Sequence, residues 1–333
     1  IMACVSIPLA AFSSIQMALY KRDFDFKTLF KVRMVGILVP LIVTVPLAFW
    51  MRSFWALVIG TIAVNVCNAV LLTIYSWNKL KEMLSFSCWS MFEQISIWLT
   101  GYIDVFAIGV FLNQYYLGLY KNSISLVGQI TGIITAATTP VLFAALSRLQ
   151  DSREDFLNLF FRFQKLVGIL VIPLGVGIFC YSDLITELLL GSQWAEAAPF
   201  IGLWGLTSAV TIVLAHYCSG VYRAVGKPKL SVLAQWLHII VLYPTVLISV
   251  RHGYETLYMA RAIVRLELIV VQLAILHYFV GISSVKMVKN VMPSILAAVV
   301  MGLAAFGLLS IGDSLWWSLS TIVIVSVVYL CVV

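Results

Sequence analysis

The feature that most constrains this chain is a series of apolar stretches, each long enough to cross a lipid bilayer. A transmembrane helix needs about 20 largely apolar residues, and short polar segments divide the 333 residues into eleven such stretches. The stretches lie at residues 1–19, 34–51, 54–77, 86–112, 117–146, 165–183, 197–221, 229–250, 255–280, 291–310 and 315–333. The sequence therefore predicts an all-α integral membrane protein with about eleven transmembrane helices.

Composition excludes the water-soluble classes of protein. Hydrophobic residues make up 62% of the chain and charged residues 11%, whereas soluble domains contain roughly 45–50% and 25%. We therefore exclude a cytosolic enzyme, a nucleic-acid-binding protein and a disulfide-rich secreted domain. The six cysteines lie in or beside apolar stretches without a CxxC pair, so we predict no redox centre and no metal site.

Basic residues mark the cytoplasmic loops. The odd-numbered predicted loops carry sixteen Lys and Arg residues and the even-numbered loops carry three. Because positive charge accumulates on the cytoplasmic side, the first helix begins outside and the eleventh ends inside. Both chain ends are apolar, so we expect a fragment of a longer protein that lacks an odd number of helices at its front.

Several motifs, in order along the chain, resemble the polysaccharide flippases (Wzx type) of the multidrug/oligosaccharidyl-lipid/polysaccharide exporter superfamily. The resemblance covers almost the whole chain and depends on the order and spacing of the motifs. They are residues 21–26 (Lys-Arg-Asp-Phe-Asp-Phe), Asp104 before Gly109, residues 117–120 (Leu-Gly-Leu-Tyr), 140–151 (Pro-Val-Leu-Phe-Ala-Ala-Leu-Ser-Arg-Leu-Gln-Asp), 190–194 (Leu-Gly-Ser-Gln-Trp), 197–199 (Ala-Ala-Pro) and 224–228 (Ala-Val-Gly-Lys-Pro).

This resemblance implies a two-lobed, MATE-like transporter fold from which about three N-terminal helices are missing. Residues 1–80 would form the second half of the N-terminal lobe, residues 84–280 the C-terminal lobe, and residues 286–333 two accessory helices. It also implies a location in the bacterial cytoplasmic (inner) membrane. The implied function is export of undecaprenyl-diphosphate-linked oligosaccharide to the outer leaflet by alternating access, with membrane lipids and a polysaccharide polymerase as further partners.

Two carboxylates in the stretch 86–112 are candidates for ion coupling. Glu93 and Asp104 are eleven residues apart, which places them within about 20° of one helix face. Ionised groups at bilayer depth are costly and mark ion or substrate paths, so we predict a face that lines a water-filled cavity and binds a coupling H⁺ or Na⁺, with no other cofactor. The alternative for Glu93 is that its side chain reaches the cytoplasmic interface.

Arg261 and Arg265 are candidates for substrate binding. They are one turn apart on the same helix face, and a planar guanidinium suits the oxygens of a diphosphate. The alternative is an ion pair with Glu267, Asp104 or Glu93, and both roles are compatible if protonation of the carboxylate releases the arginine. We expect Asp104 and both arginines to converge on one hydrated chamber.

Lys121, near the start of the stretch 117–146, is a third candidate for substrate binding, with an interfacial anchor as the alternative. On the same side of this helix, Gly128 and Gly132 form a GxxxG pair. This spacing indicates close helix packing, with a ligand path as the alternative.

Two other functions are alternatives for a multi-pass membrane chain of this kind. A drug or cation exporter of the same superfamily would have an acidic cavity without paired arginines. A membrane-embedded ligase or polymerase generally has a large outer loop, and the longest outer loop here is only the region 191–199. We therefore predict a transporter and no enzyme.

Overall fold

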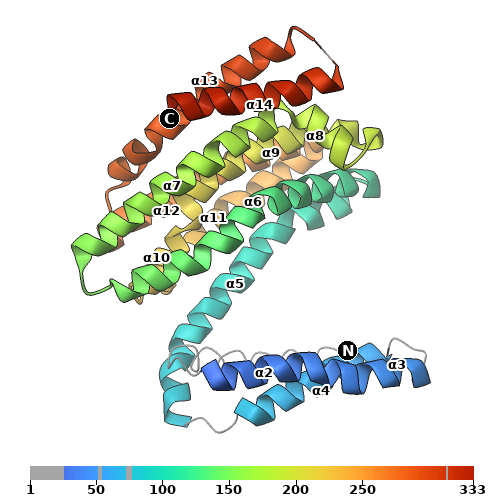
Figure 1. Cartoon of the computed structure of the whole chain (residues 1–333), viewed down its shortest axis with the longest axis vertical. Coiled ribbons are helices and arrows are strands. Elements are labelled where there is room, and N and C mark those ends of the chain that lie inside the picture. Colours follow the sequence, from blue (N-terminus) through green and yellow to red (C-terminus); the bar gives the residue numbers. More distant parts are fainter. Residues whose placement is uncertain (1–25, 52–54, 73–76, 313) are drawn as a thin grey trace. The chain divides into compact units, whose positions relative to one another are not determined.

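The computed structural model describes residues 26–51, 55–72, 77–312 and 314–333 (Figure 1). All regular elements in these ranges are helical, and nine helices or helical runs in them are long and apolar enough to cross a membrane. This confirms the prediction of an all-α, multi-pass membrane protein. Of the two other predicted spans, 1–19 lies outside the described residues, and the span 54–77 contains α4 (Trp55–Leu72), which includes the shorter apolar helix Val58–Asn68.

The described residues fall into two compact units that divide between Cys88 and Trp89. In unit 1, α2 (Phe26–Val39), η2 (Pro40–Thr44) and α3 (Val45–Met51) follow one another directly, and α4 packs against them. Gly60 of α4 faces the side chain of Thr44, where a larger residue would collide. The domain limits at residues 80, 84 and 286 stay a prediction.

Helix α5 (Trp77–Phe111) contains this division, so that its residues from Trp89 onward belong to unit 2. The other long helices of unit 2 are α6 (Gln114–Arg148), α7 (Arg153–Cys180), α11 (Lys229–Ser249), α12 (Tyr254–Ile275), α13 (Ser284–Leu309) and α14 (Leu315–Val332). Shorter elements connect them: α8 (Ser182–Leu189), η3 (Ser192–Ala197), α9 (Ala198–Thr211), η4 (Ile212–His216), α10 (Cys218–Ala224), η5 (Val250–His252) and η6 (Leu276–Val280).

Helix α9 is the centre of unit 2. It packs against α6, α7, α8 and α12, and the run Ser192–Ala224 that contains it is the most buried of the nine candidate spans. Small residues permit this close approach: a side chain at Gly205 of α9 would collide with Ile178 of α7. Helices α13 and α14 pack on each other and on α7, at one edge of the unit (Figure 1).

Several helices extend beyond the predicted apolar stretches. Helix α5 begins at Trp77 rather than 86, and α7 begins at Arg153 rather than 165. Hydropathy marks the part of a helix that lies in hydrocarbon, while backbone hydrogen bonds continue the helix into polar sequence. The acidic residues Glu154 and Asp155 in the first turn of α7 favour its early start, because they interact well with the positive end of a helix.

Two basic side chains donate hydrogen bonds to backbone carbonyl oxygens at the C-terminal end of η6. Gly281 adopts a left-handed conformation (φ 74°) and ends the helix, which leaves carbonyl oxygens without helical partners. Arg153 donates from Nη2 to the carbonyl oxygens of Val280 and Gly281, both at 3.1 Å, and Lys227 donates from Nζ to that of Phe279 at 3.1 Å. Three chain segments are joined at this end of unit 2.

Candidate functional site

A buried ion pair joins α5 to α12. Asp104 of α5 and Arg261 of α12 lie 2.8 Å apart, from Nε to Oδ2, and both side chains are almost fully buried. Breaking such a pair leaves an uncompensated charge in a medium of low dielectric constant. The pair therefore fixes α5 against α12 in this conformation.

Further hydrogen bonds complete the surroundings of Asp104. The hydroxyl of Tyr120 on α6 donates to Oδ2 at 2.6 Å, and the backbone N–H of Val105 donates to Oδ1 at 2.8 Å. Arg261 also donates from Nη2 to the carbonyl oxygen of Thr100, at 3.2 Å. Its Nη1 is buried and has no hydrogen-bond partner among the described residues, so one donor of this guanidinium remains unsatisfied.

Arg265 lies one turn further along α12 and has a different environment. It donates from Nη1 to the hydroxyl of Ser208 at 2.8 Å, and its guanidinium carbon lies 3.9 Å from the ring centroid of Trp204. Arg261 lies 5.4 Å from the same ring. Among the described residues, Arg265 forms no ion pair within 4 Å. Helix α9 thus presents one indole ring to two cations, of which only one has a carboxylate partner.

The structure brings three of the five predicted site residues together, but not in the predicted environment. Asp104, Arg261 and Arg265 group around α9, as expected for residues that converge. The polar face of α5 does not line an open cavity, because Glu93, Ser96 and Asp104 are buried. Of these three side chains, Asp104 has polar partners on neighbouring helices, whereas the hydroxyl of Ser96 donates to the carbonyl oxygen of Phe92 within α5. The hydrated chamber stays a prediction.

Glu93 lies apart from this group. It is buried, and its Oε2 has no hydrogen-bond partner among the described residues. The interpretation of Glu93 as a side chain that reaches the interface is therefore wrong. The hydroxyl of Ser231, on α11, is likewise buried and has no hydrogen bond within 3.5 Å in the part of the chain that the structure describes.

Lys121 lies outside the group as well. It is exposed on α6, and its Nζ lies 5.8 Å from the ring centroid of Tyr102 on α5. Its neighbour Tyr120 points into the protein toward Asp104, and consecutive residues of a helix differ by about 100° in direction.

Sequence reasoning did not assign four residues of the site. Tyr120 belongs to a quoted motif without a role, while Trp204 and Ser208 lie in an apolar stretch where no pattern distinguishes them. His238 of α11 pairs with Glu267 of α12, with 2.8 Å between Nδ1 and Oε2. The signal for this second pair was available, because Glu267 lies about 200° around α12 from Arg265 and must have a partner on another helix.

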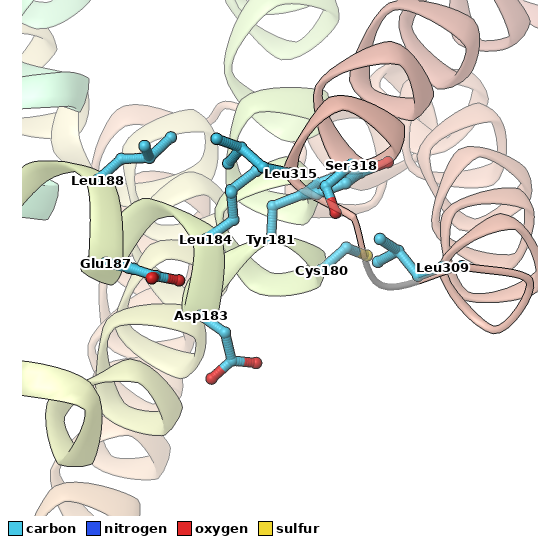
Figure 2. Close-up of a pocket in the computed structure, with 10 residues that line it drawn as sticks. Cys180, Tyr181, Asp183, Leu184, Glu187, Leu188, Leu309, Leu315 and Ser318 are labelled. Carbon is cyan, nitrogen blue, oxygen red and sulfur yellow. The ribbon is translucent and has the colours of Figure 1, made fainter. Parts of the chain in front are cut away.

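The cavity in Figure 2 is separate from these residues. It has a volume of about 530 Å³ and lies between α8 and the connection from α13 to α14. Asp183 and Glu187, one turn apart on α8, contribute its charge. Among the described residues, no group of three or more His, Cys, Asp and Glu side chains is arranged to hold a metal ion.

Comparisons with known proteins cover most of the chain. Residues 1–199 match the family model described as "Polysaccharide biosynthesis protein". An uncharacterized membrane protein in the cps region of Klebsiella pneumoniae is 23% identical over 244 residues, which are 70% of this chain and 50% of that protein. The teichuronic acid biosynthesis protein TuaB of Bacillus subtilis is 23% identical over 243 residues, which are 70% of this chain and 48% of TuaB.

A shorter match and a solved structure extend these findings. The probable low-salt glycan biosynthesis flippase Agl15 of Haloferax volcanii is 25% identical over 130 residues, 37% of this chain and 26% of Agl15. The chain thus spans about half the length of the first two curated relatives and about a quarter of the third. The lipid II flippase MurJ, in an inward closed conformation, has the same fold with a TM-score of 0.66 at 14% identity, over 99% of this chain and 72% of MurJ.

Proposed function

Because the chain belongs to the polysaccharide biosynthesis protein family, we propose that it acts in flipping an undecaprenyl-diphosphate-linked oligosaccharide across the cytoplasmic membrane. The transport direction is from the cytoplasmic to the outer leaflet, by alternating access. The membrane-spanning helical fold and the flippase named among the relatives support this proposal. A polysaccharide polymerase would then receive the oligosaccharide on the outer side.

The observation that carries the proposal is the pair of guanidinium groups at Trp204. Arg261 has an unsatisfied Nη1 donor, and Arg265 has a hydroxyl and an aromatic ring but no carboxylate within 4 Å among the described residues. A buried donor without a partner costs about 1–3 kcal/mol, and a cation at bilayer depth is costly as well. A diphosphate relieves both costs, because its oxygens accept hydrogen bonds from both groups.

Asp104 supplies a means of coupling in this proposal. In the described conformation it holds Arg261, so Asp104 and the diphosphate compete for one cation. Binding of H⁺ or Na⁺ at Asp104 weakens its hold on Arg261 and makes that guanidinium available to the substrate. Glu93, buried with an unsatisfied oxygen, is the second proposed carboxylate for ion coupling, and the ligand biases the equilibrium between the two access states.

The direct test is the substitution Arg265→Ala in cells that depend on this chain for a surface polysaccharide. We expect the polysaccharide to be lost while the abundance of the protein in the membrane holds. The matched control is Arg265→Lys, which keeps the charge but removes the planar fork, and we expect intermediate polymer. Normal polymer in the alanine variant would overturn the proposed role of Arg265.

A further inference from the structure

One surface of unit 2 is polar although it lies on membrane-spanning helices. We call it the amide–aromatic face. It consists of six residues from two neighbouring helices: Trp98 and Tyr102 of α5, and Lys121, Asn122, Ser125 and Gln129 of α6. Trp98 and Tyr102 are 55% and 38% exposed, respectively, and Lys121, Ser125 and Gln129 are exposed as well.

Contacts within the face hold it together. The rings of Trp98 and Tyr102 are stacked with their centroids 5.0 Å apart, and Lys121 Nζ lies over the Tyr102 ring. On α6, Gln129 donates from Nε2 to the hydroxyl of Ser125 at 3.1 Å. These bonds leave most of the donors and acceptors of the hydroxyl and the two amides unused, so the face can bind a polar ligand.

The polar residues of α6 lie on one side of the helix. Lys121, Asn122, Ser125 and Gln129 fall within an arc of about 100°. A cavity of about 400 Å³ is lined by the polar residues Asn122, Ser125 and Gln129 and by the apolar residues Leu126, Ile130, Ile133, Leu189 and Leu190. This volume lies in the usual range for small-molecule sites, roughly 300–1,000 Å³.

The two glycines of the GxxxG pair belong to the same side of α6, and they do not pack. Within the described part of unit 2, no atom outside the helix lies within 4 Å of where a side chain at Gly128 or Gly132 would begin. The prediction that this pair marks close helix packing is therefore wrong for this unit. The alternative of a ligand path remains.

Contact with the hydrocarbon chains of lipid would be energetically unfavourable for this face. Asn122 and Gln129 lie roughly 8 and 18 Å below the predicted outer end of the span at residue 117. At such depths a lysine or a free amide is unfavourable in hydrocarbon and is normally found facing a wet cavity or a partner. Elsewhere α6 exposes apolar residues, such as Val141 with 64% exposure.

We propose that the amide–aromatic face binds the saccharide part of a lipid-linked oligosaccharide. Sugar hydroxyls both donate and accept hydrogen bonds, as do the amides of Asn122 and Gln129 and the hydroxyl of Ser125. The C–H faces of sugar rings pack on aromatic rings such as Trp98 and Tyr102. The inference rests on the proposed function and adds to it a site for the sugars, distinct from the arginines that hold the diphosphate.

The first experiment measures whether water reaches the face when the protein is in the membrane. Ser125→Cys and Gln129→Cys variants of the full chain are labelled with a membrane-impermeant maleimide, and labelling of the native cysteines is subtracted. The matched control is Val141→Cys on the same helix. We expect at least tenfold faster labelling at positions 125 and 129. Rates equal to that at position 141 would overturn the proposal, because lipid or another helix would then cover the face.

The second experiment separates sugar binding from diphosphate binding. The purified chain is titrated with undecaprenyl diphosphate and, separately, with undecaprenyl-diphosphate-linked oligosaccharide extracted from the cells of origin. For the double variant Asn122→Leu/Gln129→Leu we expect about tenfold weaker binding of the second probe, as for loss of one or two hydrogen bonds, and unchanged binding of the first. Val141→Leu is the control and changes neither.

Each failure has its own signature. If the double variant alters binding of both probes equally, or of neither, the saccharide site is overturned while the proposed function stands. If Arg265→Ala alters binding of neither probe, the diphosphate site proposed above is overturned.

Discussion

Two pairs of glycines in unit 2 differ in how closely other helices pack against them. Between α7 and α9, a side chain at Gly175 would collide with Ala209, and one at Gly205 would collide with Ile178. Because glycine has no side chain, the two helices can come into contact at these positions. On α6, Gly128 and Gly132 meet no atom outside the helix in the described part of the unit. The same residue type thus marks tight packing in one place and open space in the other.

The polar residues of the two regions differ in the same way. Inside the unit, the carboxylate of Asp104 has partners from three helices, and His238 is paired with Glu267. On the amide–aromatic face, Lys121, Ser125 and Gln129 are exposed and Asn122 is half-buried, and most of their donors and acceptors have no partner among the described residues. The interior therefore uses polar groups to hold helices together, and on the exposed face we propose that they bind a ligand.

The largest expected effect comes from breaking the interior ion pair. Asp104→Ala leaves Arg261 buried without its carboxylate, and removal of one partner of a buried pair costs about 3–5 kcal/mol. We expect a large fall in the midpoint temperature of unfolding, measured in detergent. Replacing both residues with leucine removes the isolated charge, and a double variant no more stable than Asp104→Ala would contradict this account.

The second effect tests the contact between α7 and α9. Gly175→Ala places a methyl group against Ala209 and the carbonyl oxygen of Gly205, and overpacking of this kind costs about 1–3 kcal/mol. We expect a lower midpoint of thermal unfolding and less protein in the membrane. A midpoint equal to that of the native chain would show that the two helices can move apart freely.

The smallest effect has the opposite sign. Gly132→Ala adds a methyl group in open space and removes the entropic disadvantage of glycine in a helix, about 0.5–1 kcal/mol. We therefore expect a slightly raised unfolding midpoint in the same assay. A lowered midpoint would mean that another part of the protein packs on this face, and the comparison between the two regions would fail.

Much of the fold could be predicted from the sequence, because hydropathy indicates which segments of the chain lie in the hydrocarbon of a membrane. The helical class and nine of the spans follow from apolar stretches of sufficient length, and the motif resemblance to polysaccharide flippases is confirmed by the family match and the relatives. Helix ends were less predictable. The first turns of α5 and α7 lie in polar sequence, where hydropathy carries no signal.

The site was only partly predictable. Helical phase correctly grouped Asp104 with the polar face of α5 and Arg261 with Arg265. It could not show that this face packs against other helices, because a polar stripe has the same periodicity whether it contacts water or a partner. Nor could it assign Trp204, since an aromatic residue within an apolar stretch has no pattern that distinguishes a cation-binding ring from ordinary packing.

Arg153 and Lys227 have a consequence for the evolution and engineering of such chains. The sequence predicts that both residues lie in or beside cytoplasmic loops, where the number of basic residues rather than their exact position sets the orientation of a membrane protein. These two also secure the carbonyl oxygens of Phe279, Val280 and Gly281. Moving these charges to other loops, in order to invert the orientation of the protein in the membrane, would therefore also remove hydrogen bonds that connect the end of η6 to α7 and to the segment between α10 and α11.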